Sequence, residues 1–329
     1  MIQFAKKLSF VGAGLLSAGL VFTSAVQAQT LKLGLVTPPG HVWTQVGERI
    51  NENLQEKSDG AMKVEVNTLS KLGPEAQMIN LLQSGAMPIG IITLGALTNR
   101  DESLTGWSLP YLFDDVEHAA QATQLEAAQQ MLANLEAHGM LGVGYAFAGM
   151  RHVLSTKPVN EPSDLVGQKI RAFPSAIFND WWTANGAAPT AMPLSEVAPS
   201  LTTNLLNAVD VDLDAVVGMK FHQQAPYLTL TNHMAFPAVI VVSKRYWDRL
   251  DENKQKMLME SIKEAEQWGY QRAIDADIAN LAAVKADGAE VVEIDVTSFK
   301  EIGDQVNQKY LTSNPLRAQF YEQVQNLKN

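Results

Sequence analysis

Cysteine is absent from the 329-residue sequence. This absence excludes disulfide bridges and metal sites built on thiolates. It also excludes lipid attachment through an N-terminal cysteine. The protein must therefore obtain its stability from a packed core, for which a chain of this length is ample.

Positive charge is scarce, because 25 lysines and arginines face 35 aspartates and glutamates, a formal net charge of −10. Nucleic acids and anionic membrane surfaces are both bound by basic faces, so the composition disfavours both partners. An acidic protein that binds an anion must do so with a few focused positive groups.

Long apolar runs are also missing beyond the N-terminus, where no segment reaches about 18 uninterrupted apolar residues. The N-terminus itself has the pattern of a secretory signal peptide. Lys6 and Lys7 precede an apolar stretch over residues 8–22, and Val26 and Ala28 supply the small residues of a cleavage site. We therefore predict that residues 1–28 are a signal peptide and that the mature protein is periplasmic. Its removal takes away two lysines and no acids, which leaves a net charge of 23 − 35 = −12.

The rest of the chain alternates between strand-like and helix-like segments. Strand patterns occupy residues 31–36, 62–66, 89–94, 140–147, 152–155, 168–171, 209–213 and 291–294, with two more within 228–242. Helix patterns lie between them, including one long helix over residues 117–138. This order predicts an α/β fold with a mostly parallel sheet and helices on both faces.

The longest helix pattern begins after Asp251, a predicted N-cap, and stops at Gly288. Such a helix is too long for one small lobe, so we expect it to bridge two lobes with a cleft between them. Residues 29–150 are predicted to form lobe I together with return segments from the later chain, and residues 151–242 mainly lobe II. Residues 243–329 would then supply the bridging helix and a helical tail.

Two arginines, Arg151 and Arg171, end strand-like segments. A guanidinium is permanently charged and presents a planar fork of donors that matches a carboxylate two bonds at a time. An arginine at the end of a short strand is well placed to hold an anion in a cleft. The alternative is that both are solvated or paired with acids of the protein.

Motifs for metal binding and catalysis are incomplete or missing from the sequence. Asp210, Asp212 and Asp214 alternate as in a calcium loop, but Ala215 stands where that loop needs glycine and Phe221 where it needs glutamate. A strand followed by Asp214 capping a helix explains the run without metal. The six histidines lack close metal spacing, and no phosphate loop or nucleophile elbow occurs. We predict no metal, no cofactor and no enzymatic activity; a secreted enzyme is the alternative.

Eight short motifs follow one another along the chain: Lys71-Leu72-Gly73-Pro74-Glu75, Leu82-Gln83-Ser84-Gly85, Leu109-Pro110-Tyr111-Leu112-Phe113, Gly149-Met150-Arg151, Asp164-Leu165-Val166-Gly167-Gln168-Lys169-Ile170-Arg171, Ser195-Glu196-Val197, Lys220-Phe221 and Leu230-Thr231-Asn232-His233. Each is weak alone. In this order and spacing, over about residues 30–242, they resemble the solute-binding proteins of TRAP (tripartite ATP-independent periplasmic) transporters.

The resemblance implies a two-lobed, periplasmic-binding-protein-like fold that captures an organic acid and performs no chemistry on it. It also implies delivery of that acid to TRAP membrane permease subunits, with transport coupled to an ion rather than to ATP. Arg171 would form a two-bond salt bridge with the substrate carboxylate. Arg151 would approach the same carboxylate or a second polar group. Whether the protein is a monomer or a homodimer stays open.

Further ligand-binding residues are implied by position: Val36, Thr93, Leu194, Asp210, Val211 and Phe236, to which the loop position of Phe173 adds one more. At Asp210 the run Asn207-Ala208-Val209-Asp210 departs from the family's usual Asp-Gly-x-Glu. Most of these positions are apolar here, so we predict a monocarboxylate with a hydrophobic or aromatic body rather than a polyhydroxylated acid. The alternative for each apolar residue is ordinary core packing, which we also expect for Trp43.

Other functions share much of this pattern. A dicarboxylate or a 2-oxo acid could be the ligand of the same type of protein. An extracytoplasmic sensor subunit would use the same cleft and signal to a receptor. The receptor of an ATP-driven importer is a further alternative, which the set of motifs disfavours.

Overall fold

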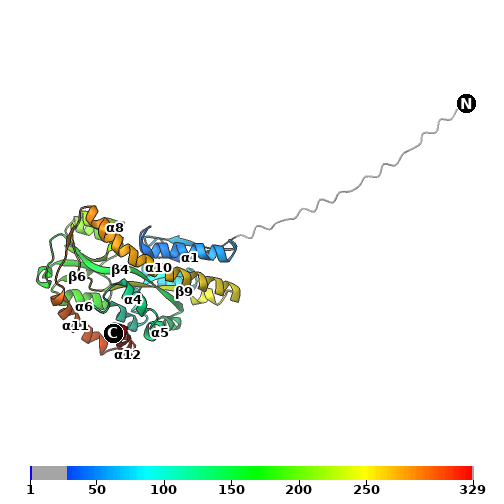
Figure 1. The fold of residues 1–329 in the computed structure, drawn as a ribbon. Helices are drawn as coiled ribbons and strands as arrows, with labels where there is room; N and C mark the ends of the chain where they lie inside the picture. The colour runs from blue at the N-terminus through cyan, green and yellow to red at the C-terminus, as the bar shows by residue number, and fades with distance from the viewer. Residues whose placement is uncertain (2–27, 328–329) are drawn as a thin grey trace.

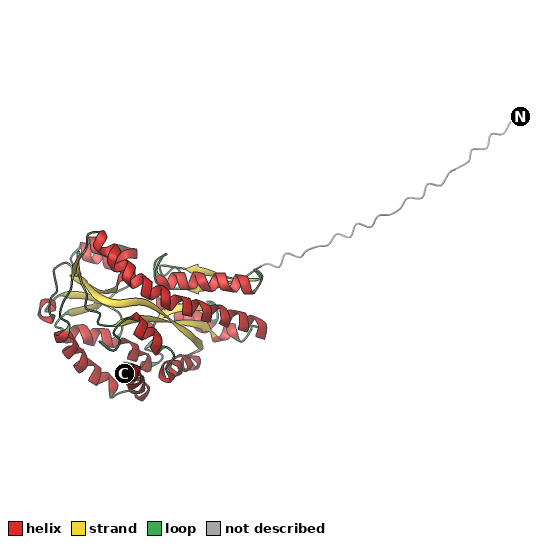
Figure 2. Cartoon of the chain, viewed as in Figure 1, coloured by secondary structure: helices red, strands yellow, loops and turns green. Residues whose placement is uncertain are grey.

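The computed structural model describes residues 28–327 together with Met1 (Figure 1). The predicted signal peptide, residues 1–28, therefore lies almost entirely outside the described residues. A β-sheet runs through the described part, and helices lie on both sides of it (Figure 2). Within this part of the chain, no helix has the length and apolar character needed to cross a membrane.

The strands form one connected sheet in the order β2-β1-β3-β9-β4-β7-β5-β6, while β8 pairs with β4 and β10 with β8. Every residue of β3 and β9 is buried, as expected for central strands covered on both faces. The strands are β1 (Gln29–Gly34), β2 (Met62–Asn67), β3 (Ile89–Thr93), β4 (Met140–Ser155), β5 (Lys169–Ala172), β6 (Ala188–Ala191), β7 (Ala208–Asp212), β8 (Tyr227–Thr229), β9 (Ala235–Ser243) and β10 (Glu290–Val292).

The α-helices follow the amphipathic patterns of the sequence; α1, for example, buries Val46, Ile50 and Leu54 along one face. They are α1 (Val42–Lys57), α2 (Glu75–Ser84), α3 (Leu94–Leu97), α4 (Val116–Ala122), α5 (Glu126–Asn134), α6 (Ala176–Ala184), α7 (Val197–Thr202), α8 (Leu213–Met219), α9 (Lys244–Trp247), α10 (Glu252–Ala286), α11 (Thr297–Leu311) and α12 (Pro315–Leu327). Short 3-10 helices are η1 (Glu102–Ser108), η2 (Leu135–His138), η3 (Pro162–Leu165), η4 (Leu194–Glu196) and η5 (Phe221–Gln223).

Two elements, β4 and α10, belong to both halves of the molecule. The first part of β4 pairs with β9, and its last five residues pair with β7. The helix α10 packs on α1, on β4 and on α8, and Figure 1 shows it running across the molecule from α8 past α1. Buried residues form one large core and a second one around Leu154, Val209 and Phe221. The architecture is thus α/β with two halves joined by a long helix, as predicted.

The limits of α10 match the prediction from its end signals. The Asp251 side chain accepts a hydrogen bond of 2.9 Å from the backbone N–H of Lys254, which satisfies one of the free donors at the helix start. At the other end Gly288 adopts a φ of 96°, a conformation that favours glycine. The boundaries of lobe I, lobe II and the tail remain predictions.

The expectation of a mostly parallel sheet is wrong, because the sheet is mixed. β1 is parallel to β2 and β3, and β5 is parallel to β6 and β7. Between these groups β9 lies antiparallel to both β3 and β4, and β4 is antiparallel to β7. The strand that returns from the later chain to the middle of the sheet causes the difference, and a local pattern carries no information on it.

The single long helix expected over residues 117–138 is instead α4, α5 and η2. The break falls at Thr123–Leu125, where the Thr123 hydroxyl donates to the Ala120 carbonyl at 2.6 Å and the backbone of Leu125 is extended. Threonine side chains compete with the helix for such carbonyls. Conversely, the two strands expected at residues 140–147 and 152–155 are one strand, β4, with register shifts that absorb the interruption.

The alternating acids of residues 210–214 form a strand end and a helix start, but the predicted cap was assigned to the wrong residue. Asp212, not Asp214, caps α8 by accepting a hydrogen bond of 2.8 Å from Ala215 N–H. Asp214 lies in the first turn of α8 and accepts a bond of 2.6 Å from Val42 N–H, at the start of α1. Among the described residues no cluster of three or more metal-binding side chains occurs.

Candidate ligand-binding site

A cavity of about 720 Å³ lies between the two halves of the molecule. Its walls come from segments far apart in the sequence: the start of α1, the start of α2, the end of β3, the end of β5, η4, the end of β7 and β9. Eight of the nine predicted ligand-binding residues line it: Val36, Thr93, Arg151, Arg171, Phe173, Leu194, Val211 and Phe236.

Arg171 is held in place by the sheet around it. It pairs with Thr190 of β6 and Val209 of β7, and its neighbour Ile170 points to the opposite face and is fully buried. The Arg171 Nε donates a hydrogen bond of 3.2 Å to the carbonyl of Met192. Only 4% of the residue is exposed.

The charge of Arg171 has no acidic partner within 4.0 Å among residues 28–327, because no ion pair of this residue occurs there. Burial, and next the nearby charge of Arg151, lower the pKa of Arg171 to about 10. The group therefore remains a cation at neutral pH. A buried cation that faces a cavity without a counter-ion can bind an anion there.

Arg151 is also buried, but its charge is already balanced. Its Nε donates to Asp210 Oδ1 and its Nη2 to the Asp210 carbonyl, while Nη1 lies 3.7 Å from Asp212 Oδ2. Its guanidinium carbon Cζ lies over the ring of Phe236, 4.0 Å from the ring centroid. Arg151 therefore contributes positive charge to the cavity wall from a position fixed by protein partners.

Asp210 is the one predicted residue that does not line the cavity; it lies behind Arg151. Trp182 Nε1 donates to its Oδ2 at 2.7 Å, and His233 Nε2 lies 3.4 Å from Oδ1. Burial alone would raise the pKa of Asp210, but the charges of Arg151 and His233 hold it below its ordinary value. The geometry suits a residue that positions Arg151.

Three aromatic rings form a continuous part of the cavity wall. The rings of Trp43 and Phe236 are stacked with centroids 5.3 Å apart, and Phe173 meets Phe236 edge-on at 5.4 Å. Trp43 was expected to be core only; it is fully buried, yet it also lines the cavity. The sequence feature that could have predicted this second role is the position of Trp43 in the first turn of α1, next to the loop that reaches the cavity.

Glu75 and Arg100 also line the cavity, and sequence reasoning gave neither a role. Glu75 is the first residue of α2, and its Oε1 accepts a bond of 2.7 Å from Thr93 N–H. Its Oε2 accepts a second bond, of 2.9 Å, from the Thr93 hydroxyl. Burial raises the pKa of Glu75 to about 7. The motif containing Glu75 was noted in the sequence, but only the fold brings it near Arg171.

A polar contact joins the two halves beside the cavity. His41, which caps α1, accepts from Trp43 N–H through Nδ1, and its Nε2 lies 3.6 Å from Asp212 Oδ1. Asp214 accepts from Val42 N–H at 2.6 Å. We name this set, His41 and Val42 of α1 with Asp212 and Asp214 of the second half, the α1–α8 contact.

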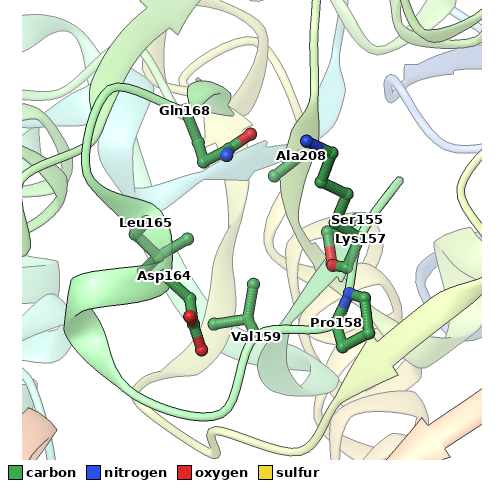
Figure 3. A pocket seen from close by; sticks show the side chains of 8 residues that line it. All are labelled: Ser155, Lys157, Pro158, Val159, Asp164, Leu165, Gln168 and Ala208. Carbon is green, nitrogen blue, oxygen red and sulfur yellow. The ribbon is translucent and has the colours of Figure 1, made fainter.

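A second, smaller cavity of about 200 Å³ shares no lining residue with the first, and Figure 3 shows the side chains around it. Its polar groups serve local turns: Ser155 Oγ donates to the Lys157 carbonyl at 2.7 Å, and Asp164 Oδ2 accepts from Asn160 N–H at 2.8 Å. Lys157 is exposed to solvent. This cavity is therefore a shallow surface depression whose polar groups stabilise the loop around it.

Comparison with known proteins agrees with this geometry. The DctP family, described as bacterial extracellular solute-binding protein, family 7, matches residues 33–314. The chain belongs to this family. Family 7 proteins are the binding proteins of TRAP transport, and as such they are not enzymes but bind solutes outside the cytoplasm and work with membrane permease subunits. The family predicted from the eight motifs is confirmed.

Relatives with names and structures bind acids of several kinds. The 2,3-diketo-L-gulonate-binding periplasmic protein YiaO of Escherichia coli is 29% identical over 97% of this chain and 98% of its own. A TRAP periplasmic solute-binding protein from Sulfitobacter sp. NAS-14.1 with bound β-D-galacturonate is 25% identical, with a TM-score of 0.85 over 91% of this chain and all of that one. One from Bordetella bronchispeptica, with density assigned as pantoate, is 25% identical with a TM-score of 0.85 over 90% of this chain and 98% of that one. This chain, as a member of family 7, thus shares its two-lobed fold with these proteins.

Proposed function

We propose that this TRAP solute-binding protein captures a small organic acid in the 720 Å³ cavity and delivers it to its membrane permease subunits. The observation that carries the proposal is Arg171, a buried cation that faces the cavity without an acidic partner among the described residues. We propose that residues 1–28 direct export to the periplasm and are removed there.

The carboxylate of the ligand would bind Arg171 through two parallel hydrogen bonds. Such charged bonds are worth roughly 1.5–3 kcal/mol each, and more where water is excluded. Arg151 would add to the positive potential without supplying the primary contact, because Asp210 already occupies its Nε and Nη2. Asp210 would act by holding Arg151 in place.

The finer proposal is that the ligand is a monocarboxylate with an apolar or aromatic body. The apolar part of the lining supports it, since Val36, Val211 and Leu194 join the aromatic rings in the cavity wall and offer few hydrogen bonds. Burying an apolar ligand surface against them contributes about 25 cal/mol for each Å² removed from water. Phe173 would cover the carboxylate end, because its ring centroid lies 5.5 Å from the Arg171 guanidinium.

One observation favours a dicarboxylate instead. Arg100 lines the same cavity from the first half of the molecule and forms no ion pair within the described part of the chain. Unlike Arg171 it is only half-buried, so solvent screens its charge and weakens its pull on a second carboxylate. We therefore rank the dicarboxylate second.

Calorimetry and thermal unfolding with a panel of acids test the proposal. The protein is first refolded from denaturant, so that any copurified ligand is lost. The panel holds aliphatic and aromatic monocarboxylates, short dicarboxylates, sugar acids and 2-oxo acids. An acid present at about 100 times its Kd should stabilise the fold by roughly 2.7 kcal/mol.

The Arg171→Lys variant should lose about 100-fold or more in affinity, because a point charge replaces the two-bond fork. The matched control is Arg249→Lys, the same substitution at an exposed site outside the cavity, which should bind like the wild type. Equal affinity in Arg171→Lys and wild type would refute the role of Arg171. Preference for dicarboxylates, abolished in Arg100→Gln, would establish the second candidate.

A further inference from the structure

Glu75 has acceptor capacity that the protein leaves unused. A carboxylate offers about four lone-pair positions. Thr93 occupies one on each oxygen, through its backbone N–H and its hydroxyl. Within residues 28–327 no further hydrogen bond or ion pair to Glu75 occurs, and the side chain lines the cavity. The remaining acceptor positions are therefore available to a ligand.

Glu75 also lies near the group proposed to bind the carboxylate. The charge of Arg171 acts to lower the pKa of Glu75, and Glu75 in turn acts to raise the pKa of Arg171. No Arg171 guanidinium nitrogen lies within 4.0 Å of a Glu75 oxygen, since the two form no ion pair. Since both residues line the same cavity of about 720 Å³, a small ligand held by Arg171 can present a neighbouring atom to Glu75.

We propose that Glu75 is a specificity-determining residue that selects acids carrying a hydroxyl group close to the carboxylate. The hydroxyl donates to a Glu75 oxygen while the carboxylate lies on Arg171. This inference rests on the proposed function, because it requires an acid in the cavity. Both Glu75 oxygens already act as acceptors toward Thr93, and the ionised form, which only accepts, fits that arrangement.

The competing ligands lack the donor that Glu75 needs. An unsubstituted acid leaves the remaining acceptor positions of the Glu75 carboxylate without a donor and cut off from water. A 2-oxo acid places its carbonyl oxygen, another acceptor, against Glu75. Glu75 is half-buried, and leaving acceptor positions of its carboxylate without a donor is the basis for discrimination. A preference of about 10- to 100-fold for the hydroxy acid is expected from one charged hydrogen bond.

The proposal predicts the direction of a pH effect. The titratable or charged side chains that line the cavity with Glu75 are His41, Arg100, Arg151, Arg171 and Asp212. With its pKa near 7, Glu75 holds a proton in part of the unliganded molecules at neutral pH. A hydroxy acid binds the ionised form and releases that proton, so its affinity rises as the pH rises through 7. A 2-oxo acid would favour the protonated form and show the opposite slope.

The test compares acids that share a carbon skeleton: 3-phenylpropanoate, 2-hydroxy-3-phenylpropanoate and 2-oxo-3-phenylpropanoate, and the corresponding 4-methylpentanoate set. Calorimetry at pH 6, 7 and 8 measures each Kd for the full mature protein. In Glu75→Gln the hydroxy acid should lose its preference and its pH slope, while the unsubstituted acid binds about as before. Glu65→Gln, the same substitution at an exposed site outside the cavity, should leave both unchanged.

The outcomes separate this inference from the proposed function. If the acids bind through Arg171 but the hydroxy and unsubstituted acids have equal affinities in the wild type, the inference is wrong and the proposed function stands. If the hydroxy acid keeps its preference in Glu75→Gln, the inference is also wrong. If no carboxylate binds, the proposed function itself fails. If Glu75→Gln does not fold, the wild-type protein alone tests the inference. It must then prefer the hydroxy acid over the unsubstituted acid, and its affinity for the hydroxy acid must rise with pH.

Discussion

At the scale of single residues, two arginines that look alike in the sequence have different roles in the structure. Both are buried and both line the cavity. Arg151 is held by Asp210 and Asp212, whereas Arg171 donates only to a backbone carbonyl among the described residues. The difference depends on which acids the fold brings close. The positions at strand ends predicted the pair, and only the family resemblance assigned the two members different roles.

The Asp210→Asn variant should be destabilised by about 3–5 kcal/mol at pH 7, because it leaves the buried charge of Arg151 without its counter-ion. Urea denaturation of both proteins measures the difference. As a control, Asp248→Asn removes an exposed acid paired with Lys244 and should cost less than about 1 kcal/mol. Equal stability of wild type and Asp210→Asn would show that Arg151 does not need this partner.

The same pair predicts how stability depends on pH. Arg151 and His233 hold the pKa of Asp210 below its ordinary value against the effect of burial, so the folded protein keeps this proton less readily than the unfolded chain. The stabilisation is therefore complete above the unfolded pKa of about 3.9, and it is lost as the pH falls below that value. The difference in free energy of unfolding between wild type and Asp210→Asn should stay constant from pH 8 to about 5 and become smaller below about pH 4. A gap that changes between pH 8 and 6 would contradict this origin.

At the scale of elements, the ends of the longest helix were predictable, whereas the cap of α8 and the interruptions of other elements were not. Asp251 and Gly288 mark α10 because capping is local chemistry that the sequence displays. The break at Thr123 coincides with a bond from its hydroxyl to the Ala120 carbonyl, which the apolar pattern does not display. The continuity of β4 depends on pairing with a distant strand, which no local pattern contains. The site residues divide in the same way. Arg171 was predicted from a local motif, whereas Glu75 and Trp43 line the cavity because of how α2, β3 and α1 are arranged in the fold.

Gly149 lies in β4 within a register shift of its pairing with β9, between Phe147 and Met150. Its φ is +112°, and a Cβ added there would lie 2.6 Å from Asp277 Oδ1 of α10. Gly149→Ala should therefore destabilise the protein by roughly 2–4 kcal/mol in urea denaturation, the sum of backbone strain and overpacking. In the control Gly288→Ala the φ is similar, +96°, but no atom lies within 4 Å, so only the strain remains. Equal losses of stability in the two variants would mean that the Asp277 side chain moves aside without an energetic penalty.

At the scale of the whole molecule, the α1–α8 contact joins the halves that form the cavity. It links the start of α1 to acids at the end of β7 and the start of α8, and Asp212 also lies 3.7 Å from Arg151. The contact and the ligand site therefore share charged groups. A ligand that touches both halves and a contact that holds them together favour the same arrangement, so each should strengthen the other.

Asp214→Ala tests this coupling, because Asp214 does not line the cavity. The substitution removes the acceptor for Val42 N–H and for the Asn280 amide of α10. We expect an affinity about 10-fold weaker for the best acid of the panel, a cost of about 1.4 kcal/mol, although no ligand contact is lost. Calorimetry measures it, and the control Asp287→Ala removes an acid bonded to His222 at a site outside both the cavity and the α1–α8 contact. If Asp214→Ala lowers the melting temperature and leaves the affinity intact, the contact stabilises the fold without assisting capture. If the affinity falls in Asp214→Ala alone, the arrangement of the two halves sets how tightly the acid is held.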